Sequence, residues 1–252
     1  MNAINVPIKI APPLQMTIRQ HIFTRAGLKR FADLDRLLQV LDVQTGGIRR
    51  LGPNADCFVV RRGWDQRTES AIMGPIERQF GILAKRILSG ELATLDCAEN
   101  CVASTMYSLW RIRHHRAQNP IPDHKIGNRP ERPVLDTGMD QGEHYGIISI
   151  TSDGMIPGYM LAGPLLQSAL DRQAEAMAGK RWGIVRAGEG EFAMPDSFGE
   201  FMVIPLSPAC CLIADEANGT AARDGVAQLN GLARISATKY LAARDFSACP
   251  GL

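Results

Sequence analysis

The sequence predicts an α+β fold, with short strands and one β-hairpin arranged around a central antiparallel helical hairpin and a C-terminal helix. Apolar residues recur every three or four positions in two long central segments, which is the spacing of amphipathic helices. Short apolar segments bounded by turn residues cluster toward both ends of the chain and predict strands. This segregation of strands and helices favours the α+β class. A length of 252 residues and a hydrophobic share of 45% fit one domain over residues 1–252.

The N-terminal part of the chain predicts extended structure and a hairpin. Residues 1–20 are interrupted by prolines and look extended, and a short segment headed by His21 follows them. Residues 36–51 hold two apolar stretches separated by Thr45-Gly46-Gly47, which predicts a β-hairpin. Residues 56–60, with the sequence DCFVV, predict another short strand.

Residues 67–90 and 94–116 predict the two helices of the central hairpin, joined by a few residues. Pro75 lies inside the first pattern and predicts a kink or a late start, because proline disrupts a helix interior. Gly90 is expected to end the first helix, and Thr94 is expected to cap the second. The predicted seam between the helices consists of Ile76, Phe80, Leu83, Met106 and Leu109.

Residues 117–145 are polar and rich in proline, which predicts a long loop or an insertion. The segments after it predict a strand at 146–150, a helix at 158–180 and further strands at 181–187 and 200–214.

The last predicted strand and the closing helix have recognisable features. Pro205 and Pro208 favour a sheet edge or a bulge, because proline cannot donate to a strand ladder. Cys210 and Cys211 are expected to alternate, one facing inward and one outward. Residues 220–245 predict an amphipathic helix whose inward face consists of Val226, Leu229, Ala233, Ala237 and Tyr240.

A series of short motifs follows the order seen in a known bacterial family. His21, Leu28 and Phe31 match the family's opening pattern, and Thr24, Arg25 and Gly27 stand where the family carries Pro, Gln and Tyr. The later motifs are Thr45-Gly46, Ile76-Glu77, Arg111, MPDSFG at 194–199, PLSP at 205–208, Asn230 and the segment 237–241. From about residue 19 to residue 245, the chain therefore resembles the family known as domain of unknown function 4238. The resemblance implies a shared fold and a set of recurring polar positions, and it brings no activity with it.

Three polar residues are candidates for chemistry. His21, Glu77 and Asp196 could supply a base, an acid and an orienting group, provided that the fold brings them within hydrogen-bond distance. In the alternative interpretation they are structural: His21 caps the segment that follows it, and Glu77 pairs with Arg111 across the helical hairpin. The structural interpretation is favoured, because the family's opening motif is altered around His21.

A cationic stretch extends from the end of the second central helix into the proline-rich segment. Its members are Arg111, Arg113, Arg116, Lys125, Arg129 and Arg132, with Asp123 and Glu131 among them. The formal net charge is only +2, so this local excess points to a binding surface for phosphates or an acidic protein surface. A solvated helix terminus is the alternative, since cations also favour the helix dipole there. Trp110 falls on the apolar side, which argues against a platform for stacking bases.

The sequence predicts neither a metal site nor a cofactor. Cys97 and Cys101 share a helical face but no other thiols have matching spacing, and the adjacent His114 and His115 point about 100° apart on a helix. P-loop, GxGxxG, GxSxG and HExxH motifs are absent from the sequence. Apolar runs do not approach the roughly 18–20 residues that a membrane span requires. The six thiols are expected to be reduced, as they are in a cytoplasm.

Two functions follow as hypotheses. In the first, the protein is a non-catalytic binding protein that docks on a protein or ribonucleoprotein partner, for example as a mobile-element or phage accessory that inhibits host defence; nucleic acid is a further partner for the basic stretch. In the second, the protein is a hydrolase acting on nucleic acid or a nucleotide through His21, Glu77 and Asp196. The first is favoured, because the sequence contains no complete catalytic motif.

Overall fold

The computed structural model describes residues 16–126 and 136–252, and it confirms the α+β class. The α-helices of these residues are α1 (Arg25–Arg30), α2 (Gly74–Leu88), α3 (Cys97–Gln118), α4 (Asp136–His144), α5 (Ala162–Ala176) and α6 (Arg223–Ser236). Short helical turns are η1 (Asp56–Phe58), the π-helical η2 (Thr68–Met73), η3 (Gly158–Leu161) and η4 (Phe246–Ala248).

The strands in the described part of the chain form two four-stranded and two two-stranded sheets. The first large sheet has the order β11 (Gly219–Ala221), β7 (Trp182–Ala187), β10 (Cys210–Ala214) and β9 (Val203–Ser207). The second has the order β3 (Ile48–Leu51), β2 (Leu38–Asp42), β12 (Tyr240–Ala243) and β8 (Met194–Pro195). The small sheets pair β1 (Arg19–His21) with β4 (Val59–Arg61), and β5 (His124–Lys125) with β6 (Met155–Ile156). All the pairings are antiparallel except that of β11 with β7.

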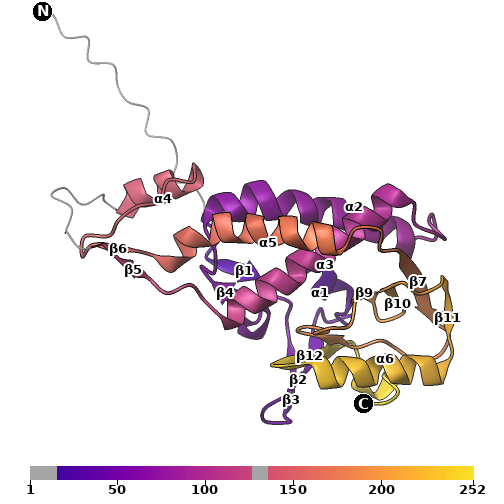
Figure 1. Ribbon diagram of the computed structural model, residues 1–252. Coiled ribbons are helices and arrows are strands. Elements are labelled where there is room, and N and C mark those ends of the chain that lie inside the picture. The colour runs from indigo at the N-terminus through magenta and orange to yellow at the C-terminus, as the bar shows by residue number, and fades with distance from the viewer. Residues whose placement is uncertain (1–15, 127–135) are drawn as a thin grey trace, which may run out of the picture.

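The long helices occupy one side of the molecule, and the two large sheets with α6 occupy the other (Figure 1). The central helix α3 packs against both α2 and α5. An arm, which we define as β5, α4 and β6, projects from the end of the helical layer remote from the large sheets (Figure 1). The predicted hairpin at 36–51 is confirmed as β2 and β3, with the Thr45–Gly47 turn between them.

The central helical hairpin is confirmed as α2 and α3, which pack together across the short connection 89–96. Pro75 lies in the first turn of α2, directly after the π-helical turn η2, so the predicted late start is correct. Gly90 follows the helix at φ 80°, a left-handed conformation that glycine adopts without steric cost. The N-cap of α3 is Asp96 and not the expected Thr94, because Asp96 and Glu99 form a reciprocal capping box.

The residues of the predicted seam lie in the core, with Ile76 half-buried and the other four buried. Aromatic side chains connect this seam to the rest of the fold. The ring of Trp110 lies 4.7 Å from that of Phe23, and the indole N–H of Trp182 donates to Ser104 Oγ at 2.9 Å. The position of Trp110 on the apolar side is thereby confirmed, since it is 2% exposed.

Strand β9 lies at a sheet edge, as Pro205 predicts. The pairing of β9 with β10 is interrupted by a bulge between Cys210 and Cys211. Because of this irregularity, and because the strand lies inside the core, both thiols are buried at 1% exposure. The expectation that one of them faces outward is therefore wrong.

Four other expectations are corrected by the structure. The loop expected at 117–145 contains the end of α3 as well as β5 and α4, and the strand expected at 146–150 is irregular chain. The strand expected at 56–60 begins as the turn η1 and becomes extended only at Val59. The closing helix ends at Ser236, and Tyr240 belongs to β12, since this segment completes the sheet between β2 and β8.

Candidate functional site

His21 ends strand β1 and is held by a backbone contact. Its Nε2 lies 3.0 Å from the carbonyl oxygen of Pro53, so the neutral ring donates its proton there. His21 does not cap the following helix as expected, because Thr24 Oγ1 accepts the N–H of Gly27 at the N-terminus of α1. Burial lowers the pKa of His21, although the contact with Pro53 and the charge of Glu77 act in the opposite direction.

The lowered pKa of His21 predicts a pH-dependent contribution to stability. The folded protein binds this proton less readily than the unfolded chain, so the free energy of unfolding should fall as the pH drops below about 6.5. We expect His21→Gln to flatten this dependence between pH 7.5 and 5.5, because the neutral amide can still donate to Pro53. His21→Ala should cost about 1 kcal/mol at pH 7.5, the value of one ordinary hydrogen bond. Urea denaturation at several pH values measures both effects, and an identical pH slope in wild type and His21→Gln would contradict them.

Glu77 lies on α2 and pairs with Arg113, not with Arg111 as expected. The Arg113 side chain is 1% exposed, and its guanidinium also lies 3.7 Å from Glu69 and 5.4 Å from the centre of the Trp64 ring. The indole N–H of Trp64 in turn donates to Glu69 at 2.5 Å. This cluster satisfies a buried cation with two carboxylates and ties α3 to α2 and η2.

Asp196 is 1% exposed and anchors the start of β12. Its carboxylate accepts the backbone N–H groups of Thr238 at 2.8 Å and Lys239 at 3.1 Å, and the hydroxyl of Thr238 at 2.5 Å. His114 Nε2 lies 3.0 Å from the same carboxylate. Burial opposes ionisation, but the hydrogen bonds from His114 and Thr238 outweigh it and lower the pKa of Asp196.

The three candidate catalytic residues do not form one constellation. Within residues 16–126 and 136–252, no hydrogen bond or ion pair joins any two of His21, Glu77 and Asp196. The contact of Asp196 with His114 and Thr238 also differs from a nucleophilic triad. In such a triad, one ring nitrogen of the histidine bonds to the acid and the other ring nitrogen bonds to the hydroxyl. In this protein a single nitrogen, His114 Nε2, faces both Asp196 and Thr238.

The predicted cationic stretch is divided by the fold. Arg113 belongs to the buried cluster and is no part of a surface, which corrects the expectation that its side chain is exposed. Arg111 and Arg116 remain half-buried on the last turns of α3, and Lys125 is exposed on β5 of the arm. The guanidinium of Arg111 lies 5.8 Å from the centre of the Tyr107 ring. Arg129 and Arg132 lie outside the described residues.

The arm is held to the body by a residue that sequence reasoning missed. Glu143 of α4 is 2% exposed, and its carboxylate accepts the guanidinium of Arg62 and the backbone N–H of Gln66, the latter at 2.8 Å. Arg62 also donates to the hydroxyl of Tyr159 at 2.6 Å. Burial raises the pKa of Glu143 despite these partners. Residues 117–145 have the composition of a polar loop, and they show no apolar periodicity that could indicate the buried contact of Glu143.

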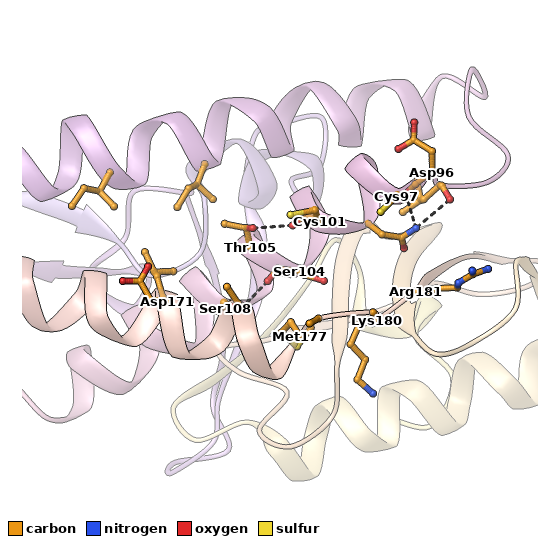
Figure 2. Close-up of a pocket in the computed structure, with 18 of the residues that line it drawn as sticks. Asp96, Cys97, Cys101, Ser104, Thr105, Ser108, Asp171, Met177, Lys180 and Arg181 are labelled. Carbon is orange, nitrogen blue, oxygen red and sulfur yellow. Dashed lines mark hydrogen bonds between the residues drawn. The ribbon is translucent and has the colours of Figure 1, made fainter.

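A groove of about 900 Å³ runs between α2, α3 and α5 (Figure 2). This volume lies within the range of small-molecule sites in proteins. Its floor is one face of α3, which carries Cys97, Cys101, Ser104, Thr105 and Ser108. The hydroxyls of Thr105 and Ser108 donate to carbonyl groups of α3 itself, and Ser104 Oγ accepts the indole N–H of Trp182, whereas Cys97 and Cys101 are free, exposed thiols. The sequence showed the shared face of the thiols but not the groove, since α5 comes from a distant part of the chain.

A second cavity, of about 510 Å³, lies beside the attachment of the arm. Glu143 and Asp65 both line it. Asp65 accepts the backbone N–H and the hydroxyl of Thr68, at 2.8 and 2.6 Å, where the helical segment containing η2 begins. Both carboxylates therefore have structural roles.

No family model matches the chain, and no curated protein or solved structure shows significant similarity to it. The resemblance to domain of unknown function 4238 stays a prediction. The described ranges contain no group of three or more His, Cys, Asp or Glu side chains arranged to hold a metal ion. In the same ranges no helix has both the length and the hydropathy that a membrane span requires.

Proposed function

We propose that this protein acts by binding, and that it docks on a protein or ribonucleoprotein partner through the cations at the end of α3 and on the arm. The observation that carries the proposal is the engagement of all three candidate catalytic side chains in structural contacts. His21 is bound to a backbone carbonyl, Glu77 neutralises a buried arginine, and Asp196 accepts four hydrogen bonds.

The docking surface in this proposal consists of Arg111, Arg116 and Lys125. Arg113 is excluded from it, because a guanidinium that is 1% exposed cannot meet a partner. Lys125 is exposed on β5, which belongs to the projecting arm (Figure 1). Cations at such a position mainly speed association and set the orientation of the partner, and their effect is screened by salt.

The test is a charge reversal with a matched control. A tagged protein is recovered from its host, its stoichiometric partner is identified, and the purified pair is titrated at two salt concentrations. Arg116→Glu with Lys125→Glu should weaken binding at least about tenfold at low salt and much less at high salt. Lys29→Glu with Lys85→Glu changes the charge equally at exposed positions on α1 and α2 and should leave the affinity unchanged. Equal affinities of wild type and the first variant at low salt would exclude this surface.

The proposal also covers the location and the biological role of the protein. A cytoplasmic location fits six free thiols, since reducing compartments preserve them. The role in this proposal is that of a mobile-element or phage accessory that inhibits host defence. The hydrolase is the alternative proposal. Turnover of a nucleic acid or nucleotide by the wild type, abolished in a folded His21→Ala variant, would replace the binding function with catalysis.

A further inference from the structure

The six cysteines fall into two classes. Cys57, Cys210, Cys211 and Cys249 pack in or against the core, and burial raises the pKa of each of their thiols, to about 11 for Cys57 and about 12 for Cys249. Cys97 and Cys101 are exposed and line the groove between α2, α3 and α5 (Figure 2). Exposed free thiols are unusual, because cysteine is among the most buried residue types. This pair therefore calls for an explanation that packing does not supply.

The four-residue spacing of Cys97 and Cys101 allows a bridging metal ion but not a disulfide bond. Residues four apart on an α-helix have Cβ atoms about 5–6 Å apart on the same face. A disulfide requires about 3.5–4.5 Å between Cβ atoms, so Cys97 and Cys101 cannot join each other while α3 stays helical. A metal ion with two sulfur ligands at about 2.3 Å requires sulfur atoms about 4.6 Å apart when it is linear, which the helix allows.

Charges of both signs surround the pair, since Asp96 and Asp171 line the groove together with Lys180 and Arg181. Cys97 is the first residue of α3 and follows the N-cap Asp96, so it lies at the positive end of the helix dipole. Arg181 lines the same groove, and no ion pair of its side chain exists among the described residues. Two thiolates bound to a monovalent ion carry one net negative charge, which the helix N-terminus and Arg181 would stabilise against the opposing charge of Asp96.

We propose that Cys97 and Cys101 form a two-thiolate site for one soft d¹⁰ metal ion of the monovalent copper class. Thiolates select such ions, and a linear two-coordinate ion needs no third protein ligand. Binding replaces two S–H bonds by two S–Cu bonds and releases two protons to solvent, with no change in oxidation state. The site is independent of the docking surface, so either proposal can fail without the other.

The experiment is an anaerobic titration of the fully reduced chain with Cu(I) against a competing chelator. We expect one ion per chain, an ultraviolet sulfur-to-copper absorption band and the release of two protons. Cys97→Ser and Cys101→Ser should each weaken Cu(I) binding at least about 100-fold. The reason is that a second ligand held on the same helix raises the affinity by about 100-fold or more over a single ligand. Zinc, which takes four ligands, should bind far more weakly than copper.

The sharpest control moves one thiol along the same face. Cys101→Ser with Thr105→Cys keeps six thiols and a groove-lining position, but it separates the pair by eight residues, or about 12 Å along the helix. This variant should bind as weakly as the single variants. Affinity equal to that of the wild type, in this variant or in either single one, would overturn the site.

A second measurement on the unmodified protein does not depend on how the variants fold. A thiol reagent should modify two cysteines rapidly and four slowly in the native state, and one equivalent of Cu(I) should protect the two rapid ones. Rapid thiols that remain reactive with copper present would also overturn the proposal.

Discussion

Phe80→Ala should lower the free energy of unfolding by about 3–5 kcal/mol, the usual cost of removing a buried aromatic ring. Phe80 lies on α2 and is 1% exposed within the seam that α2 forms with α3. The loss contains the transfer free energy of the ring and the cost of the cavity left between the two helices, which can collapse only in part.

Ile82→Ala is the matched control for Phe80→Ala. Ile82 is on the same helix but is 64% exposed, so its truncation should change the stability by less than about 0.5 kcal/mol. Chemical denaturation of the three proteins at one pH measures both values. A loss below about 1 kcal/mol for Phe80→Ala would mean that the seam between α2 and α3 is not part of the core.

The helical hairpin was predictable because its signal is local. Apolar residues at three- and four-residue spacing depend only on the chain itself, and Pro75 and Gly90 act within one turn of their own positions. The Asp96–Glu99 capping box is also a local pattern, and it is a stronger indication of a helix start than Thr94 alone.

The closing segment shows where local patterns fail. Residues 237–245 are rich in alanine and continue a helical spacing, yet β12 is buried and pairs with β2 on one side and β8 on the other. Tertiary pairing overrides helix propensity here, since propensities amount to only tenths of a kcal/mol per residue.

The environment of the candidate site residues also depends on contacts between segments that are far apart in the sequence. Whether Arg113 is a surface cation or a buried one depends on Glu69 and Glu77, which lie 44 and 36 positions earlier in the chain. α3 is the central helix and packs against both α2 and α5, so even its basic C-terminal half has a buried side. A single sequence gives the residue types of such a cluster but not the neighbours that bury it.

Asp196→Ala should destabilise the protein by about 3–5 kcal/mol, because it leaves several partly buried donors without an acceptor, at roughly 1–3 kcal/mol for each one that water does not reach. The backbone N–H groups of Thr238 and Lys239 lose their partner, as does the Thr238 hydroxyl. Asp171→Ala, which removes an exposed carboxylate from α5, should change the stability by less than about 0.5 kcal/mol. A similar small effect for both variants would mean that Asp196 does not hold the start of β12.

The pH dependence of Asp196 has the opposite cause to that of His21. Its folded-state pKa lies below the ordinary value of 3.8, so its contribution to stability is present above about pH 3.8 and is lost as the pH falls through the folded-state value. Asp196→Asn has no carboxylate to protonate, and it should therefore lack this part of the acid-induced loss. Denaturation of the wild type and Asp196→Asn between pH 6 and pH 2.5 tests this directly. If the two proteins lost stability in parallel over that range, the folded-state pKa of Asp196 would not lie below its ordinary value, and its hydrogen bonds would not stabilise the ionised carboxylate.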